Sequence, residues 1–295
     1  MDKSTILNEP ETVDFKGVRY VSLRLLWDCN LRCIMCDHPH RARNEMSLQT
    51  AERVLDQLTH PVRLTFIGGE PCLWLMRYPQ VLRRAIHDGH VVHMITNGIL
   101  LEKLPDFVNA FRDQSVSVQF SIDGFEKTYE RIRKRSSWAA VVRAIRLLQA
   151  KREEGKNEKA FITAGYLLMR STLADLPQFI RFCAHEGLDA VSLTYTMIYD
   201  SMVQRGEISE EESVYFHQEE TNQAINNAID VAREEGISIN FPPLLGEPTV
   251  FGRKWSGPVK ASLAPGASFL PARENLACDK PWKEIFVNQD GTIIP

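Results

Sequence analysis

The sequence lacks several features that mark whole classes of protein. It has no apolar run of about 18 residues, the length that a membrane-spanning helix needs. Its first residues, Met1 to Thr5, do not follow the charged-then-apolar layout of an export signal. Six cysteines in 295 residues are few for a disulfide framework. These absences predict a cytoplasmic protein with reduced cysteines and no membrane partner.

The chain also lacks a large excess of positive or of negative charge. The formal net charge is -3, so the sequence gives no electrostatic reason to expect a nucleic-acid partner. The hydrophobic fraction of 44% and the charged fraction of 25% are ordinary for a globular protein. No internal repeat and no low-complexity tract interrupts the chain. Its length is sufficient for one large core or two modest ones.

Three of the cysteines stand close together, in the run Cys29-Asn30-Leu31-Arg32-Cys33-Ile34-Met35-Cys36. Three thiolates on one short loop can bind three irons of a cubane [4Fe–4S] cluster, which normally takes four thiolates. The fourth iron is then left to bind a substrate or a cofactor. A zinc site is the first alternative, although zinc sites usually pair C-x2-C or C-x2-H units. A disulfide framework is the second alternative.

Short apolar segments alternate with amphipathic helical patterns between about residue 18 and residue 240. This alternation predicts a parallel sheet built from βα units. In barrels of such units the chemistry lies at the C-terminal ends of the strands. The six predicted strands are Tyr20–Trp27, Val62–Ile67, His90–Thr96, Ser115–Ile122, Ala160–Met169 and Ala190–Thr196.

The predicted helices have recognisable ends. Ser47 is placed to cap the helix that follows the cysteine run, and Gly89 to close a later one. A long polar helix is predicted over Ser209 to Glu235, with an acidic start that suits a helix N-terminus. Cys183 lies on the apolar stripe of another helix, which predicts a core position.

The segment Ser115–Ile122 alternates strictly between apolar and polar residues. Its valines and Phe120 share one face, which we expect to pack on the helices, while Ser117, Gln119 and Ser121 share the other. The polar face then points into the interior of a barrel. A polar interior suits a substrate cavity, because a structural barrel would fill that space with branched apolar side chains.

A second motif, Gly68-Gly69-Glu70-Pro71, directly follows the second predicted strand. Two glycines allow backbone to approach a ligand closely, and Glu70 offers a carboxylate to an ammonium group. Taken by itself, the motif could equally be a simple turn between a strand and a helix. The next residue, Cys72, is expected to be a small buried thiol.

Together the two motifs resemble the radical S-adenosylmethionine (SAM) superfamily, whose pattern is C-x3-C-x-φ-C with an aromatic residue usual at φ. Met35 occupies that position here, a mild departure. The resemblance covers about residues 18–295 and implies an α/β fold, a partial (βα)6 TIM-like barrel. It divides the chain into an N-terminal lead-in (1–17), the barrel (18–240), a linker or covering loop (241–277) and a C-terminal extension (278–295).

The resemblance also implies a cofactor site. Cys29, Cys33 and Cys36 would bind the [4Fe–4S] cluster, and Gly68-Gly69-Glu70-Pro71 would bind the methionine amino group of SAM. Ser121 and Asp123, at the end of the fourth strand, would hydrogen-bond the ribose, and an arginine in the next helix would pair with the SAM carboxylate. The cofactor-binding residues implied are Gly68, Gly69, Glu70, Pro71, Asn97, Ser121, Asp123 and Arg133. The adenine contacts and any general acid or base stay unassigned.

The last eighteen residues begin at Cys278 and resemble the start of a SPASM or twitch extension, whose first part reads C-x(9–15)-G-x4-C. Ile285–Val287 and Thr292–Ile294 would form its hairpin, with Asp290-Gly291 at the turn. We therefore expect a truncated extension in which Cys278 binds an auxiliary [4Fe–4S] cluster of the intact protein. The alternative is a surface hairpin with a spare thiol.

The resemblance implies a radical enzyme supplied with electrons by a flavodoxin or ferredoxin. The reduced cluster would cleave SAM to a 5′-deoxyadenosyl radical, which takes a hydrogen atom from the substrate. Cys29 comes too early for an additional N-terminal peptide-binding domain, which favours a small polar substrate, such as a carbohydrate or aminocyclitol. One alternative is modification of a peptide or protein side chain. A second is a non-catalytic iron–sulfur module that carries electrons.

Overall fold

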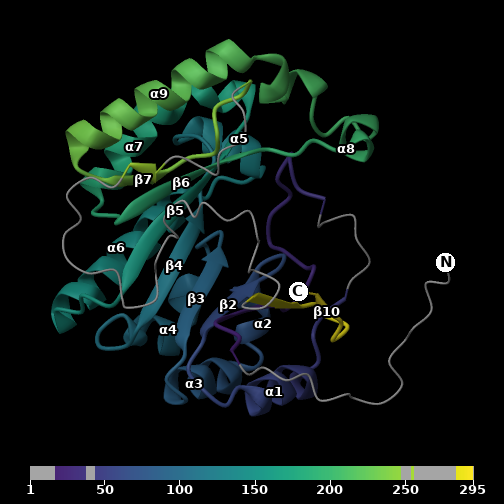
Figure 1. Ribbon diagram of the computed structural model, residues 1–295, viewed down its shortest axis with the longest axis vertical. Coiled ribbons are helices and arrows are strands. Elements are labelled where there is room, and N and C mark those ends of the chain that lie inside the picture. The colour runs from purple at the N-terminus through teal and green to yellow at the C-terminus, as the bar shows by residue number, and fades with distance from the viewer. Residues whose placement is uncertain (1–16, 38–43, 247–253, 256–283, 295) are drawn as a thin grey trace.

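A curved, mostly parallel β-sheet forms the centre of the molecule (Figure 1). The computed structural model describes residues 17–37, 44–246, 254–255 and 284–294, and the account that follows concerns these residues. The strand order is β10-β9-β1-β2-β3-β4-β5-β6-β7-β8. From β9 to β7 all neighbours are parallel, and the two outermost pairs are antiparallel. The predicted α/β fold with a parallel sheet is confirmed.

Strands and helices alternate along the chain from β1 to β7. The strands are β1 (Tyr20–Arg24), β2 (Arg63–Ile67), β3 (Val91–Thr96), β4 (Val116–Ser121), β5 (Phe161–Leu168), β6 (Ala190–Tyr195), β7 (Ser238–Asn240), β8 (Lys254–Trp255), β9 (Glu284–Val287) and β10 (Ile293–Ile294). The α-helices are α1 (Leu48–Gln57), α2 (Pro71–Leu75), α3 (Pro79–His87), α4 (Pro105–Ala110), α5 (Lys127–Arg133), α6 (Trp138–Gly155), α7 (Leu176–His185), α8 (Asp200–Gln204) and α9 (Gln218–Glu235). None of these helices is long and apolar enough to cross a membrane.

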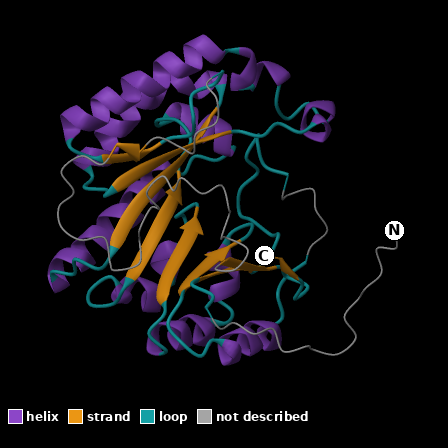
Figure 2. Cartoon of the chain, viewed as in Figure 1, coloured by secondary structure: helices purple, strands orange, loops and turns teal. Residues whose placement is uncertain are grey.

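The helices follow one side of the sheet, and the core lies between the two layers (Figure 2). In β4 the side chains of Val116, Val118 and Phe120 are buried in this core, as the alternation predicts. The other face of the sheet is polar along its central strands. Gln119 and Ser121 of β4 lie half-buried on this polar face, which we call the lumen face.

Local sequence signals explain most element boundaries. All six predicted strands are present, with ends that differ from the prediction by at most a few residues. Ser47 caps α1, because its hydroxyl accepts the Thr50 N–H at 3.0 Å. Cys72 and Cys183 are fully buried, as expected.

The long helix predicted from Ser209 is wrong in its first third. Helix α9 begins at Gln218, and the acidic triplet occupies a separate 3-10 turn, Glu210–Glu212. Ser209 caps that turn by accepting the Glu211 N–H at 3.2 Å. A second 3-10 turn follows and buries Val214 in the core, so the chain changes direction before α9 starts.

The C-terminal hairpin joins the sheet beside β1. Strands β9 and β10 are antiparallel, and the turn contains Gly291 with φ +83°, a conformation that favours glycine. The Arg24 guanidinium lies 4.6 Å from the ring centroids of both Trp27 and Phe286. It also donates to Asn288 Oδ1 at 3.1 Å. These contacts hold the predicted hairpin against the edge strand of the barrel.

Candidate functional site

The cysteine loop begins at the C-terminal end of β1 and continues toward α1. Cys29, Cys33 and Cys36 are half-buried, and all three are free thiols. The loop is attached to α5 by a hydrogen bond from Ile34 N–H to the Ile132 carbonyl at 3.0 Å. Met35, which stands where the family pattern usually has an aromatic residue, is 8% exposed. It packs in a small apolar cluster made of Ile34, Met35, Ile132, Met169, Met202 and Ile208.

Hydrogen-bond donors contact the sulfur atoms of Cys29 and Cys33. Cys29 Sγ accepts the Leu31 N–H at 3.4 Å and an Asn97 Nδ2–H at 3.8 Å. Cys33 Sγ accepts from Arg133 Nη1 at 3.5 Å. Such donors stabilise thiolates and influence the reduction potential of an iron–sulfur cluster.

The Cys29 thiol has a raised pKa in the absence of iron. Burial, opposed by the Leu31 N–H, raises the pKa of this thiol to about 12. Glu70, Cys33 and Cys36 raise it further, because a second negative charge is unfavourable beside theirs. A bound metal removes the proton outright. The three thiols and their donors therefore fit the predicted [4Fe–4S] cluster.

A zinc site differs from a cluster site, because several side chains must converge on a single metal ion. Within the described residues, no group of three His, Cys, Asp or Glu side chains is placed to hold one metal ion. A cubane cluster does not require such convergence, because each thiolate binds a different iron.

The two glycines of the second motif lie directly against the chain that enters the cysteine loop. A Cβ added to Gly68 would lie 2.4 Å from the Leu26 carbonyl oxygen, and one on Gly69 would lie 2.1 Å from that of Asp28. Gly69 N–H donates to the Leu26 carbonyl at 2.7 Å, and Glu70 N–H donates to the Asp28 carbonyl at 2.9 Å. The sequence predicted close approach to a ligand. The structure adds a close approach to Leu26–Asp28, which positions Cys29.

This packing predicts the effect of one added methyl group. Gly69→Ala should displace the Asp28 backbone, and with it Cys29, since the clash is with backbone that cannot rotate away. We expect the variant to keep its far-UV circular dichroism but to bind less than half the iron of the parent after reconstitution. Gly206→Ala is the control: its φ of +66° makes alanine strained there, but the added Cβ would meet nothing within 4 Å, so this variant should lose some stability and keep its iron. Full iron loading of Gly69→Ala would show that this packing does not position the loop.

Glu70 is buried among hydrogen-bond donors of the protein itself. Its side chain is 0% exposed. It accepts from Cys72 N–H at 3.1 Å, from Thr96 Oγ1 at 2.7 Å and from Asn97 N–H at 2.9 Å. Burial raises the pKa of this carboxyl group, while these donors oppose the rise. Glu70 thus caps α2, which has Pro71 in its first turn, and joins the end of β2 to the end of β3.

Asn97 connects the end of β3 to the cysteine loop. Its Nδ2 donates to Asn30 Oδ1 at 2.7 Å, while its Oδ1 accepts the Ile99 N–H at 3.1 Å. Asn97 was predicted from the sequence, but its partner Asn30 was not assigned a role. Arg135, also unassigned, donates to the Asn30 carbonyl at 3.0 Å. The position of Asn30 between two cysteines was the available signal.

Asp123 and Arg133 form a buried ion pair beside the cysteine loop. Asp123 Oδ2 accepts from Arg133 Nη2, and Oδ1 accepts the Leu167 N–H at 2.8 Å. The exposed fractions are 1% for Asp123 and 7% for Arg133. Burial alone would lower the pKa of Arg133, but Asp123 beside it raises this pKa well above the usual range. The Arg133 Nε–H is buried and has no partner among the described residues, so this arginine retains one donor.

The predicted site residues therefore gather at one end of the barrel. The structure joins Cys29, Cys33, Glu70, Asn97, Asp123 and Arg133 through the contacts above, and Ser121 lies half-buried on the lumen face next to them in the chain. Both Asp123 oxygens already accept from protein groups, and each can accept a second hydrogen bond. The contacts with SAM stay predictions. Cys278 lies outside the described residues.

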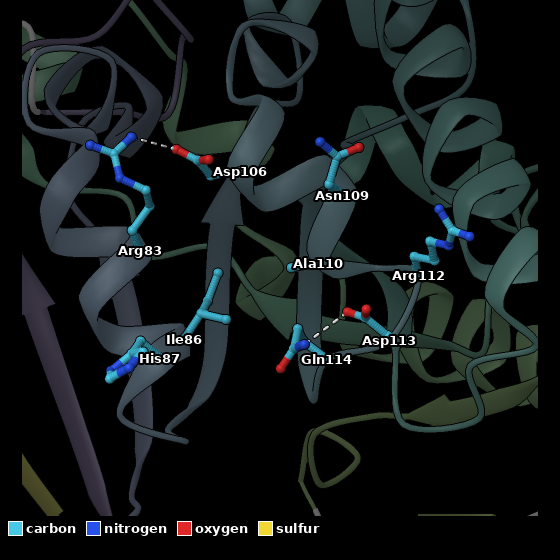
Figure 3. A pocket seen from close by; sticks show the side chains of 9 residues that line it. All are labelled: Arg83, Ile86, His87, Asp106, Asn109, Ala110, Arg112, Asp113 and Gln114. Atoms are coloured by element: carbon cyan, nitrogen blue, oxygen red, sulfur yellow. Dashed lines mark hydrogen bonds and ion pairs between the residues drawn. The ribbon is translucent and has the colours of Figure 1, made fainter.

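A surface groove lies elsewhere, between α3 and α4 (Figure 3). It measures about 510 Å³. An ion pair crosses it between Arg83 Nη1 and Asp106 Oδ2, 3.1 Å apart. Its lining includes Arg112–Gln114, which precede β4, so it is at the opposite end of that strand from the cysteine loop. None of the predicted site residues lines this groove.

Comparison with known proteins places this site in a family. The family model described as "Radical SAM superfamily" matches residues 28–183, more than half of the chain and all three cysteines of the loop. An uncharacterized protein of Methanocaldococcus jannaschii is 26% identical over 118 residues, which are 37% of this chain and 40% of that protein.

Solved structures share the fold at low sequence identity. Streptococcus suis SuiB bound to S-adenosylmethionine matches with a TM-score of 0.63 and 13% identity, over 95% of this chain and 60% of that one. The AdoMet-bound structure of anSMEcpe matches with a TM-score of 0.59 and 17% identity, over 74% of this chain and 60% of that one. The chain thus covers about 60% of the length of these structural neighbours. At these identities the likeness shows the fold alone.

Proposed function

The chain belongs to the radical SAM superfamily, and on this premise we propose that it cleaves SAM reductively and abstracts hydrogen from a peptide or protein side chain. The observation that carries the first part is the cysteine loop, which places three free thiols at the C-terminal end of the sheet, with hydrogen-bond donors on Cys29 and Cys33. The family implies both a [4Fe–4S] cluster and SAM. When bound, the reduced cluster supplies the electron that splits the SAM sulfonium into methionine and a 5′-deoxyadenosyl radical.

The residues of this chain have separate tasks in the proposal. Cys29, Cys33 and Cys36 bind the cluster and leave one iron for SAM. The turn around Glu70 holds the methionine amino group, either by the carboxylate or by the backbone that the carboxylate fixes in place. Ser121, at the end of β4, would hydrogen-bond the ribose, and Arg133 would offer its spare Nε–H to the SAM carboxylate. The barrel then positions SAM and excludes water from the radical.

The second part of the proposal concerns the class of substrate. The sequence favoured a carbohydrate, and nothing in the comparisons supports that preference. Two neighbours of the fold have been solved with peptides: SuiB bound to precursor peptide SuiA, and anSMEcpe with bound AdoMet and the Cp18Cys peptide. We therefore propose a peptide or protein substrate and replace the carbohydrate expectation.

Three further expectations stay predictions. Cys278 would bind an auxiliary cluster in the intact protein, a flavodoxin or ferredoxin would donate the electron, and the protein would be cytoplasmic. A Cys278→Ser variant tests the first, because iron content should fall by up to four per chain in the intact protein while the barrel cluster remains. Unchanged iron content would remove Cys278 from any cluster.

The proposed activity has a direct test. Anaerobically reconstituted protein, reduced with dithionite and given SAM, should release 5′-deoxyadenosine and methionine, measured by liquid chromatography. Release should exceed that from protein without iron. A non-catalytic electron-transfer module would take up the electron and leave SAM intact, so the absence of 5′-deoxyadenosine from fully loaded, reduced protein would contradict the proposal.

A further inference from the structure

A basic residue lies on the lumen face, at the end of the barrel opposite the cysteine loop. Arg63 opens β2, where it alternates with the fully buried Leu64 and Phe66. It therefore lies on the side of the sheet away from the helices. Its Nη2 donates to Ser117 Oγ on β4 at 3.4 Å, two strands away. The side chain thus reaches across β3 over the floor of the lumen.

The groups next to Arg63 are polar and neutral. Ser117 is 4% exposed, and its hydroxyl is 2.8 Å from Nδ1 of His93, which is 8% exposed. Burial, together with the charge of Arg63, lowers the pKa of His93 to about 3, so this ring is neutral at physiological pH. Tyr20 of β1 is level with Arg63 in the parallel register.

No carboxylate of the described residues compensates the charge of Arg63. Glu284 is level with Tyr20 on the far side of β1. Two strand spacings separate the backbones of Glu284 and Arg63, or about 10 Å between their Cα atoms. Three other buried or half-buried arginines have such a partner. Arg133 pairs with Asp123, Arg152 with Asp189 and Arg84 with Asp56. Burial lowers the pKa of Arg63, as expected of a guanidinium removed from water without an acidic partner.

We propose that Arg63, with Ser117 and His93, binds a carboxylate of the substrate at the floor of the lumen. An uncompensated cation in such a place is unfavourable unless an anion arrives with the ligand. A planar guanidinium matches a carboxylate with two parallel hydrogen bonds. Ser117 adds a neutral donor beside it.

The position also suits a substrate that reacts near SAM. Ser117 and Ser121 are four residues apart on β4, or about 13 Å along the strand. Between them the lumen face carries Gln119 on β4 and Thr163 on β5, which are level with each other and only half-buried. A substrate could thus present its reacting C–H bond at the cysteine end and its carboxylate at the floor. Since this inference rests on the proposed function, the carboxylate would be an acidic side chain or the C-terminus of a peptide.

Equilibrium dialysis of the reconstituted holoenzyme with SAM tests the site. The probes are radiolabelled glutarate, neutral glutaramide and inorganic phosphate. We expect saturable glutarate binding at one site per chain, no saturable glutaramide binding, and a loss of at least about tenfold in glutarate affinity for Arg63→Gln. Arg53→Gln, which removes an equal charge from the exposed surface of α1, is the matched control and should bind as the parent does.

Further variants protect the test against misfolding. Arg63→Lys keeps the positive charge but loses the planar pair of N–H donors, so it should retain part of the affinity for glutarate. Ser117→Ala should weaken binding by a few fold. Phosphate bound more tightly than glutarate, with the same dependence on Arg63, would support the anion site and assign a phosphate as its ligand.

Two results would overturn the inference. One is the absence of saturable binding of either anion to the parent, and the other is parent-like binding by Arg63→Gln. Both can be distinguished from failure of the proposed function. Loss of SAM cleavage with intact anion binding would count against the radical chemistry alone, while SAM cleavage without anion binding would count against the floor site alone.

Discussion

Replacing Cys29, Cys33 and Cys36 together with alanine is expected to reduce 5′-deoxyadenosine formation to background. Without the three thiolates, the loop has no sulfur ligands with which to hold an iron–sulfur cluster. The measurement is 5′-deoxyadenosine released per chain under anaerobic reduction. It should be accompanied by loss of the charge-transfer absorbance of the cluster and of about four irons per chain.

A matched control separates the loop from cysteine loss in general. Cys183→Ala removes a fully buried thiol of α7 and should leave both the cluster and SAM cleavage unchanged. The variant should lose only the part of the free energy of unfolding that comes from packing one small side chain. If the triple variant produced 5′-deoxyadenosine at the rate of the parent, the assignment of the cluster to this loop would be wrong.

Spacing along the chain predicted the parallel α/β sheet, and it predicted that the two motifs lie at strand ends. The six strands follow from apolar segments bounded by turns, and the motifs fall at strand ends as parallel βα units require. The helix predicted from Ser209 failed because an acidic start resembles a helix N-terminus, while the turn that buries Val214 depends on distant core residues.

Contacts between distant residues could not be predicted from spacing. The glycine motif predicted close approach to a ligand, but its nearest neighbours are carbonyl groups of Leu26 and Asp28, some forty residues earlier. Glu70 looked like a free carboxylate, although Thr96 and Asn97 donate to it. Each of these contacts depends on the order of the strands in the sheet.

Arg63 shows the same limit in another way. In the sequence it is a single basic residue at the start of a strand, a position where solvent exposure is the ordinary expectation. Only the curvature of the sheet brings it toward Ser117, fifty-four residues later. Substrate class depends on such contacts, which explains why the sequence favoured a carbohydrate from domain organisation alone.

Removing Asp123 is expected to have the largest effect on stability. Asp123→Ala would leave the Arg133 cation buried, with the Cys33 sulfur and the Tyr129 ring beside it, because Asp123 and Arg133 are almost fully excluded from solvent. Breaking a buried pair on one side typically costs about 3–5 kcal/mol, since the remaining charge is uncompensated. Urea unfolding of the reconstituted protein, followed by circular dichroism, measures this loss.

The size of the effect depends on burial rather than on the presence of an ion pair. Asp106→Ala, which breaks the exposed pair with Arg83 across the surface groove, is the matched control and should cost less than about 1 kcal/mol. The double variant Asp123→Ala with Arg133→Met should recover part of the loss, because an apolar side chain then replaces the unpaired charge. If Asp123→Ala cost no more than Asp106→Ala, Arg133 would have to reach water or another anion. The buried pair would then contribute nothing to holding α5 against the cysteine loop.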